Sequence, residues 1–334
     1  MGLGGNLIWT SVFDAIHDQF GDVAVACDTP MITDVLAGYW YRRDTSYQND
    51  LIFRGNPDIA HVSIRPKNRI CKFIDAVFEK LVSVDRLRRA WERFVISRVL
   101  INWRSGGAPL LLHIDMRSHS YAERQTSKKT YWKTGGCAAH VIARTFGAAV
   151  TLPRCKIFPS QDEREKVQKL LDEISVSERF IVIEPETNRD WFGELRAWRR
   201  DNWQSLVLQL GNIYPDTDIV QVGVGNHGPL EGVKDLTGKT SFREVAALLG
   251  EAGLFIGTEG GLMHLAAAAA TPSVILWGGI TLPEFAGYPH QHRILCHYVD
   301  CAPCGNLGWC DHGRKCMDSI QIDEVLQAVR AELA

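Results

Sequence analysis

The sequence predicts an α/β protein in which helices alternate with the strands of parallel sheets. Short continuous apolar runs, typical of strands buried on both faces, recur along the second half of the chain. Amphipathic helical patterns stand between them, which is the alternation of βαβ units. The chain has 334 residues, enough for two domains at about 150 residues each. We therefore expect two α/β halves facing one cleft, with ligands bound at the carboxyl ends of the strands.

In the first half, the pattern predicts two strands and three helices. The strands are expected over 22–28 and 110–114, and the helices over 31–38, 71–102 and 137–146. The 71–102 helix rests on apolar residues at helical spacing, such as Phe73, Val77 and Leu81, with Lys and Arg on its other face.

The second half is more regular. Strands are expected over 180–183, 218–223, 254–256 and 273–277, and helices over 163–174, 203–210, 242–249, 265–270 and 321–333. The charged helix at 163–174 stands near a domain boundary, so we place the two domains at 1–160 and 161–334.

Charge and hydropathy narrow the functional classes. Lys and Arg number 37 and Asp and Glu 39, so the formal charge of −2 argues against a dedicated nucleic-acid binder. The apolar run 262–270 is interrupted by His264 and is far shorter than the roughly 20 residues that cross a bilayer. Asn6 stands where a myristoylation signal needs Ser or Thr, and no charged leader precedes it. We expect a cytoplasmic protein whose membrane contact, if any, is peripheral.

One turn carries a clear chemical signal. The segment Gly257-Thr-Glu-Gly-Gly-Leu-Met-His264 joins an expected strand to an expected helix. Free N–H groups at the start of that helix can hold a phosphate, and Gly260 and Gly261 let a diphosphate approach the backbone. His264 adds a donor in the first turn. The alternative is a tight turn whose glycines serve packing alone.

This segment and its neighbours resemble glycosyltransferase family 9, which contains the ADP-heptose:lipopolysaccharide heptosyltransferases. The resemblance rests on 257–268, on Thr-Pro-Ser-Val-Ile-Leu-Trp-Gly-Gly at 271–279, and on Asp-Leu-Thr-Gly-Lys-Thr-Ser-Phe at 235–242. Residues 184–203 are similar to a loop and helix of the family, and 2–11 to its N-terminal glycine-rich loop. The resemblance implies a GT-B architecture, two Rossmann-like domains facing a central cleft.

The same resemblance implies roles for individual residues. The donor site would contain Asn188, Arg196, Gly225, Glu259, Gly260, Gly261, Leu262 and His264. Arg196 stands where the family has a phosphate-contacting Lys, and Glu259 where it often has Asp near the sugar. An Arg at this position is cationic and can donate two parallel hydrogen bonds to a phosphate group. Taken alone, Arg196 would be read as a solvated surface charge.

The acceptor side departs from the family. The glycine-rich loop, with Gly4, Gly5 and Asn6, has Gly5 where the family has an Asp proposed as catalytic base. Transfer needs a base near the acceptor hydroxyl. Asp115, after the 110–114 strand, is the best-placed substitute, with Asp14 and His113 behind it. The alternative role for Asp115 is a helix cap or turn.

Five of the nine cysteines fall within residues 296–316. Four of them, Cys301, Cys304, Cys310 and Cys316, offer thiolates at short spacing that suit a tetrahedral zinc or iron ion. Related protein heptosyltransferases carry a cysteine-bound iron, so a structural metal is the favoured interpretation. Disulfides and a redox pair at Cys301 and Cys304 are the alternatives.

Together these observations predict a glycosyltransferase involved in lipopolysaccharide biosynthesis. It would move a sugar, heptose in the first place, from ADP-heptose or another nucleotide sugar to a glycan, lipid-linked or protein hydroxyl. As the resemblance implies, transfer would invert the anomeric centre. It would use no catalytic divalent cation, with Asp115, Arg196 and His264 as the catalytic groups. The rival is a relative without turnover that binds a nucleotide sugar or a protein partner and keeps the cysteine segment as a structural or assembly module.

Overall fold

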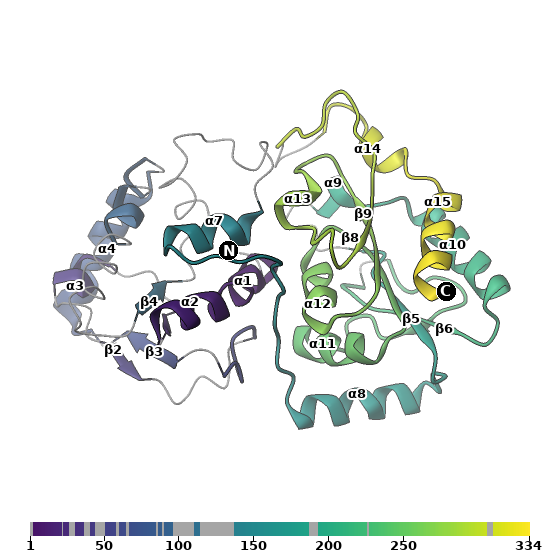
Figure 1. The fold of residues 1–334 in the computed structure, drawn as a ribbon, viewed down its shortest axis with the longest axis horizontal. Coiled ribbons are helices and arrows are strands. Elements are labelled where there is room, and N and C mark those ends of the chain that lie inside the picture. Colours follow the sequence, from purple (N-terminus) through teal and green to yellow (C-terminus); the bar gives the residue numbers. More distant parts are fainter. Residues whose placement is uncertain are drawn as a thin grey trace. The chain divides into compact units, whose positions relative to one another are not determined.

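The structure is a computed structural model (Figure 1). It describes residues 3–21, 23–26, 31–36, 41–43, 51–57, 60–64, 67–84, 86–88, 90–95, 110–113, 137–186, 193–225, 227–305 and 310–334. Contacts group the described residues into two units. One comprises those within Ile8–Tyr131 and Ala138–Pro153, and the other those within Gly2–Leu7, Trp132–Cys137 and Arg154–Ala334.

The sheet of the first unit has the order β2-β3-β1-β4. Strands β1 (Val23–Ala26), β3 (Ala60–Ile64) and β4 (Leu110–His113) run parallel, and β2 (Tyr41–Arg43) pairs with β3 antiparallel at the edge. The two strands expected here, 22–28 and 110–114, are confirmed as β1 and β4. Strands β2 and β3 were not predicted. Strand β2 has only three residues, and β3 alternates apolar residues (Ala60, Val62 and Ile64) with polar ones, whereas the strands expected in this half were continuous apolar runs.

The helices expected in the first half are present, with one change. Helices α3 (Ile32–Leu36) and α7 (Ala138–Thr145) match expectation, and α2 (Phe13–Phe20) is additional. Helix α4 (Arg69–Val82) ends much earlier than expected, and helical residues resume at 86–88 and 90–95. Ser83 forms its C-cap and donates its hydroxyl to the Lys80 carbonyl at 2.7 Å, the kind of local bond that competes with helix continuation.

The second unit is built on a six-stranded sheet in the order β10-β9-β8-β5-β6-β7, all parallel. Its strands are β5 (Phe180–Ile183), β6 (Asp218–Gln221), β7 (Lys234–Asp235), β8 (Leu254–Thr258), β9 (Ser273–Trp277) and β10 (Arg293–Cys296). Every residue of β5, β8 and β9 is buried, as expected for parallel strands covered on both faces.

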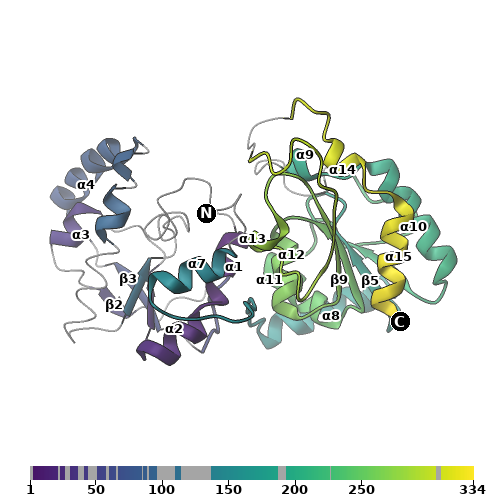
Figure 2. The ribbon, with the colours of Figure 1, turned by 45° about the horizontal axis from the view of Figure 1, so that its top comes forward.

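Helices cover both faces of this sheet (Figure 2). The longer ones are α8 (Gln161–Glu173), α10 (Arg200–Ile213), α11 (Phe242–Glu251), α12 (Gly261–Ala269) and α15 (Ile322–Leu333), and the short ones are α9 (Gly193–Arg196), α13 (Pro283–Ala286) and α14 (Lys315–Asp318). Helices α10 and α15 pack together on one face, while α8, α11 and α12 form the other layer. All the elements expected in this half are confirmed.

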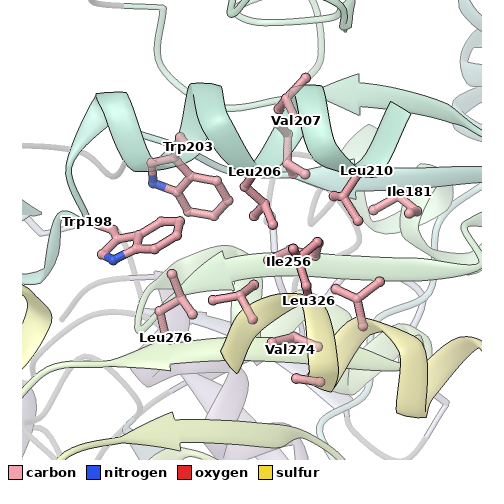
Figure 3. Close-up of a cluster of buried hydrophobic side chains, with 14 of the residues drawn as sticks. Ile181, Trp198, Trp203, Leu206, Val207, Leu210, Ile256, Val274, Leu276 and Leu326 are labelled. Carbon is pink, nitrogen blue, oxygen red and sulfur yellow. The ribbon is translucent and has the colours of Figure 1, made fainter. Parts of the chain in front are cut away.

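The core beneath α10 and α15 is drawn in Figure 3. Trp203 and Leu206 of α10 are fully buried against Ile256 and Val274 of the sheet. Trp198 packs edge-on to Trp203 with ring centroids 5.4 Å apart and donates its indole N–H to the Ile320 carbonyl at 3.0 Å. These two tryptophans belong to the hydrophobic core of the unit. None of the described helices is long and apolar enough to span a membrane.

Candidate active site

The candidate site lies where the strand order of the second sheet reverses. The chain runs outward from β5 to β6 and β7, then returns through α11 to the other side of β5 and continues from β8 to β9 and β10. Ligands bind outside the carboxyl ends of parallel strands at such a switch point. Glu184 follows β5 here, with its N–H bonded to the Ile256 carbonyl of β8 at 3.0 Å. Glu259 follows β8.

The turn after β8 exposes a helix start without a side-chain cap. Gly260 is the N-cap of α12, and no side chain bonds to the first N–H groups of the helix. A helix start of this kind, with its N–H groups and the positive end of the helix dipole, can bind an anion. A Cβ on Gly261 would come no closer than 3.4 Å to the Phe242 ring, so packing alone does not demand glycine there.

Arg196 and Glu259 meet at this edge. Arg196 Nη2 lies 3.2 Å from Glu259 Oε1, and the Arg196 side chain is 20% exposed. The Arg196 Nε atom and Glu259 Oε2 are buried without a hydrogen bond. Burial raises the pKa of Glu259, opposed by the Arg196 charge and the Thr281 hydroxyl. The pair therefore leaves polar atoms that a ligand can satisfy.

Glu184 is a second buried acid at the switch point. Only 6% of its surface is exposed, and its Oε2 atom has no hydrogen-bond partner. Burial raises the pKa of its carboxyl to about 8, so the group is largely protonated at neutral pH. The fully buried Thr258 hydroxyl at the end of β8 also lacks a hydrogen bond. Neither the protonated Glu184 carboxyl nor the Thr258 hydroxyl carries a negative charge, so neither group would repel an anion at this edge of the sheet.

His264 is held by a chain of buried side chains. Its Nδ1 atom lies 2.8 Å from the Tyr288 hydroxyl, which lies 2.9 Å from Cys155 Sγ. Burial lowers the pKa of His264 to about 3, with His292 and Arg196 acting in the same direction. The imidazole is therefore neutral at physiological pH. Burial also raises the pKa of Tyr288 well above its ordinary value.

The N-terminal glycine segment differs from the expected loop. Helix α1 (Leu3–Thr10) includes Gly4, Gly5 and Asn6. The helix forms despite its glycines because the residues that follow them, such as Trp9, are fully buried, and that burial offsets the roughly 1 kcal/mol helix cost of each glycine. Gly4, which groups with the second unit, packs on His264. A Cβ there would lie 2.8 Å from its Nε2 atom.

The other expected donor residues have different outcomes. Leu262 is buried in the first turn of α12. Gly225 lies past the end of β6, where a Cβ would come 2.8 Å from the Thr237 methyl group. Asn188, and Asp115 on the acceptor side, lie outside the described residues.

The cysteine segment surrounds a cavity of about 560 Å³. Its lining includes Cys301, Cys304, Cys310 and Cys316. Within the part of the chain that is described, no three Cys, His, Asp or Glu side chains come together closely enough to hold a metal ion. The expected ligands thus face one cavity without converging on one point. Lys315 pairs with Asp300 beside them.

Sequence reasoning missed Glu184 and Thr258 as site residues. A glutamate that directly follows an apolar strand is the signal that could have found the first. The structure places Tyr288 against His264. Its hydrogen bond depends on a loop that returns from β9, which no local pattern reveals.

Comparison with known proteins assigns the chain to a family. Residues 138–308, which are 171 of the 334 residues, match the profile of glycosyltransferase family 9 (heptosyltransferase). Lipopolysaccharide heptosyltransferase 3 of Escherichia coli strain K12 is 30% identical over 130 residues, 36% of either chain. The match thus spans about a third of the length of that relative.

Solved structures share the fold. A family 9 glycosyltransferase from Veillonella parvula superposes with a TM-score of 0.62 at 14% identity, covering 100% of this chain and 95% of that one. The ADP-heptose heptosyltransferase II of Escherichia coli gives 0.54 at 16% identity, over 98% and 94%. The iron-containing dodecameric glycosyltransferase TibC of the same species gives 0.52 at 14% identity, over 93% and 76%. The chain belongs to glycosyltransferase family 9, the heptosyltransferase family.

Proposed function

We propose that this chain transfers a heptose from ADP-heptose to a hydroxyl acceptor, with inversion and without a catalytic divalent cation. The observation that carries the proposal is the group of buried polar atoms without partners at the switch point, next to the uncapped start of α12. A nucleoside diphosphate would accept hydrogen bonds from Arg196 and from the N–H groups of α12, and hydroxyls of the sugar would donate to Glu259. The name of the Escherichia coli structural relative, ADP-heptose heptosyltransferase II, supports the donor.

The departing nucleoside diphosphate gains negative charge as the glycosidic bond breaks. Arg196, the N–H groups of Gly260, Gly261 and Leu262, and the His264 ring would stabilise that charge, which is the role of a preorganised electrostatic site. Glu259 would contact the sugar and hold Arg196 in place before the donor binds. Asn188 and Gly225 would border the nucleotide.

The acceptor would be handled by residues 1–160, with the nucleotide sugar bound by residues 161–334. We assign the catalytic base to Asp115, because an inverting transfer needs a group that takes the acceptor proton. Gly5 and Asn6 would border the acceptor. The acceptor class is a glycan, a lipid-linked sugar or a protein hydroxyl.

A membrane-bound acceptor is supported by the surface of α4. Ile70, Phe73, Val77 and Leu81 recur along one face of the helix and are 47% to 70% exposed. Together with the cationic residues Arg69, Lys72 and Lys80 they form the pattern of a helix that lies on an anionic membrane. We propose peripheral contact from the cytoplasmic side. Phe73→Ser should reduce co-sedimentation with phosphatidylglycerol vesicles, and Leu208→Ser, an exposed apolar site on α10, should not.

We also propose that the four cysteines hold a structural zinc or iron ion. Soft thiolates facing one cavity suit either metal, and the structural relative TibC is described as iron-containing. In this structure the four thiols are spread around the cavity, so binding of a metal ion would require the loop to close around it. Such a closed site leaves no position for catalysis.

Calorimetric titration with ADP-heptose, ADP, UDP-glucose and GDP-mannose tests the donor assignment. We expect selective binding of the ADP compounds and its loss in Arg196→Ala and His264→Ala. Binding of another nucleotide sugar would retain a glycosyltransferase and discard heptose. Folded protein that binds none of the four would overturn the proposal.

A further inference from the structure

Three buried side chains, Cys155, Tyr288 and His264, form a hydrogen-bonded row in the second unit. All three are less than 9% exposed. The Tyr288 hydroxyl lies between the Cys155 sulfur at 2.9 Å and His264 Nδ1 at 2.8 Å. They come from distant parts of the chain, so only the folded protein assembles the row.

The direction of hydrogen-bond donation along the row decides which nitrogen of the His264 ring carries the hydrogen. A neutral imidazole has one N–H and one bare nitrogen. If Tyr288 donates to Nδ1, the hydrogen stands on Nε2. If Nδ1 donates to Tyr288, the tyrosine must give its hydrogen to Cys155, and Nε2 becomes an acceptor.

The relative acceptor strengths of His264 Nδ1 and Cys155 Sγ favour donation from Tyr288 to Nδ1. Tyr288 keeps its hydrogen at working pH because burial raises its pKa, helped by Cys155 and Cys137. That single hydrogen goes to the better acceptor, and an imidazole nitrogen accepts far more strongly than a thiol sulfur. The Cys155 thiol can then donate to the Tyr288 oxygen. Every member of the row has a partner in this arrangement.

The surroundings hold the ring in this position. His292 Nε2 lies 3.2 Å from the carbonyl of Met263, directly before His264. Because a carbonyl only accepts, His292 donates from Nε2. Tyr288 has a left-handed φ of 51° and accepts the N–H groups of Gln291 and His292 at its carbonyl. The loop 288–292 thus contacts α12 at two places, through Tyr288 at His264 and through His292 at the Met263 carbonyl.

The opposite edge of the His264 ring packs against a glycine. A Cβ on Gly4 would overlap Cδ2 and lie 2.8 Å from Nε2. The Nε2 edge therefore faces backbone rather than a side chain that could compete for its hydrogen. At the N-terminal turn of α12, an N–H on that edge adds to the donors that an anion meets.

We propose that Tyr288 is a positioning residue that holds His264 as the Nε2–H tautomer, so that a neutral imidazole donates this hydrogen to the donor diphosphate. The tautomer follows from the row itself, and its use rests on the proposed function. A neutral donor binds the diphosphate without the cost of burying a charged ring.

Nitrogen NMR of ligand-free, ¹⁵N-histidine-labelled protein tests the tautomer directly, with His264→Gln used to assign the signals. We expect His264 to show a protonated Nε2 and a bare Nδ1. In Tyr288→Phe, which keeps the ring and loses the hydroxyl, both signals should move toward the averaged positions of exchanging tautomers. Tyr214→Phe, a half-buried tyrosine after α10, should leave them unchanged. A wild-type signal with the hydrogen on Nδ1 would overturn the proposal.

ADP titration tests whether the tautomer matters for binding. A glutamine amide can replace an Nε2–H, and an asparagine amide reaches only as far as Nδ1. His264→Gln should therefore bind ADP about tenfold more tightly than His264→Asn, the worth of one hydrogen bond to a charged group. Tyr288→Phe should weaken ADP binding about fivefold, with no further loss in the His264→Gln background, where no tautomer remains.

The outcomes separate the two proposals. An additive loss in the double variant would mean that Tyr288 acts by packing alone, which overturns its positioning role. Wild-type protein that shows the Nε2–H tautomer and binds no ADP would overturn the donor site while leaving the tautomer assignment intact.

Discussion

The second unit holds two polar clusters that are built in opposite ways. At the switch point, Glu184 and Glu259 directly follow buried central strands, Arg196 at the end of α9 pairs with Glu259, and His264 lies in the first turn of α12. The described residues of the cysteine segment 301–316 are loop and the start of one short helix, and Cys304 is exposed. In the first cluster, Arg196 and Glu259 are in contact before any ligand arrives. The second faces a cavity without converging.

The difference shows what a rigid scaffold provides. Strand ends in a packed sheet fix the positions of their side chains to within fractions of an ångström, so buried polar atoms are already in the binding geometry before a ligand arrives. A loop holds its ligands only when something cross-links them, and metal binding and folding are then one process. We therefore expect the switch-point cluster to govern donor affinity and the cysteine segment to govern local stability.

The largest effect should come from Arg196→Ala. It removes a cation that would contact the diphosphate and leaves Glu259 buried without its partner. We expect donor affinity to fall roughly 30- to 100-fold, from the loss of a charge-assisted hydrogen bond. Calorimetry with ADP measures it. The control is Arg199→Ala, whose exposed side chain pairs with Asp318, and equal losses in both variants would refute the assignment.

Glu184→Gln should change how stability depends on pH. The folded carboxyl keeps its proton up to a pKa of about 8, while the unfolded one loses it near its ordinary value of about 4.3. The unfolded state thus binds fewer protons between these values, and the free energy of unfolding falls as pH rises through them. Relative to the variant, wild type should lose about 2 kcal/mol between pH 6 and pH 8.

Urea unfolding at the two pH values measures this loss. The exposed Glu173 provides the matched control, because Glu173→Gln should leave the pH dependence of wild type unchanged. Parallel pH curves for wild type and Glu184→Gln would show that the buried carboxyl is ionised in the folded state.

Gly261→Ala separates phosphate binding from packing. The new methyl group meets the Phe242 ring at ordinary contact distance, and alanine favours a helix by roughly 0.5–1 kcal/mol. We expect stability to hold or rise while ADP affinity falls about tenfold, because the methyl group obstructs the close approach of phosphate. Gly250→Ala in α11, with open space around it, is the control. Unchanged affinity would support a turn whose glycines serve packing.

The smallest effect on donor binding should come from Cys316→Ser. Elemental analysis of purified wild type should find one zinc or iron per chain, and the variant should lose it together with thermal stability. ADP affinity should stay within about twofold, since a structural ion touches no substrate. Cys71→Ser in α4 should retain the metal. Metal-free, stable wild-type protein would contradict the metal proposal and leave free thiols or disulfides.

Much of the second unit could be predicted from its residues. The buried strands β5, β8 and β9 are continuous apolar runs, and their helices begin at recognisable signals such as the Ser241 capping box. Arg196 and Glu259 were both expected at the donor site, and the structure brings them together. The helix α1 was not expected, because glycines near a chain start favour a loop locally and only the burial of Leu7 and Trp9 reverses that preference.

The sequence by itself determined the class of the fold, the family and the residues around the turn after β8, because these depend on local periodicity and short-range motifs. Tertiary structure alone decided which groups lie unpaired beneath that turn and which nitrogen of His264 is engaged. Both depend on burial and on contacts between residues far apart in the chain, as between Cys155 and Tyr288. The pKa of a carboxyl such as Glu184 is set by the same burial, which no local pattern contains.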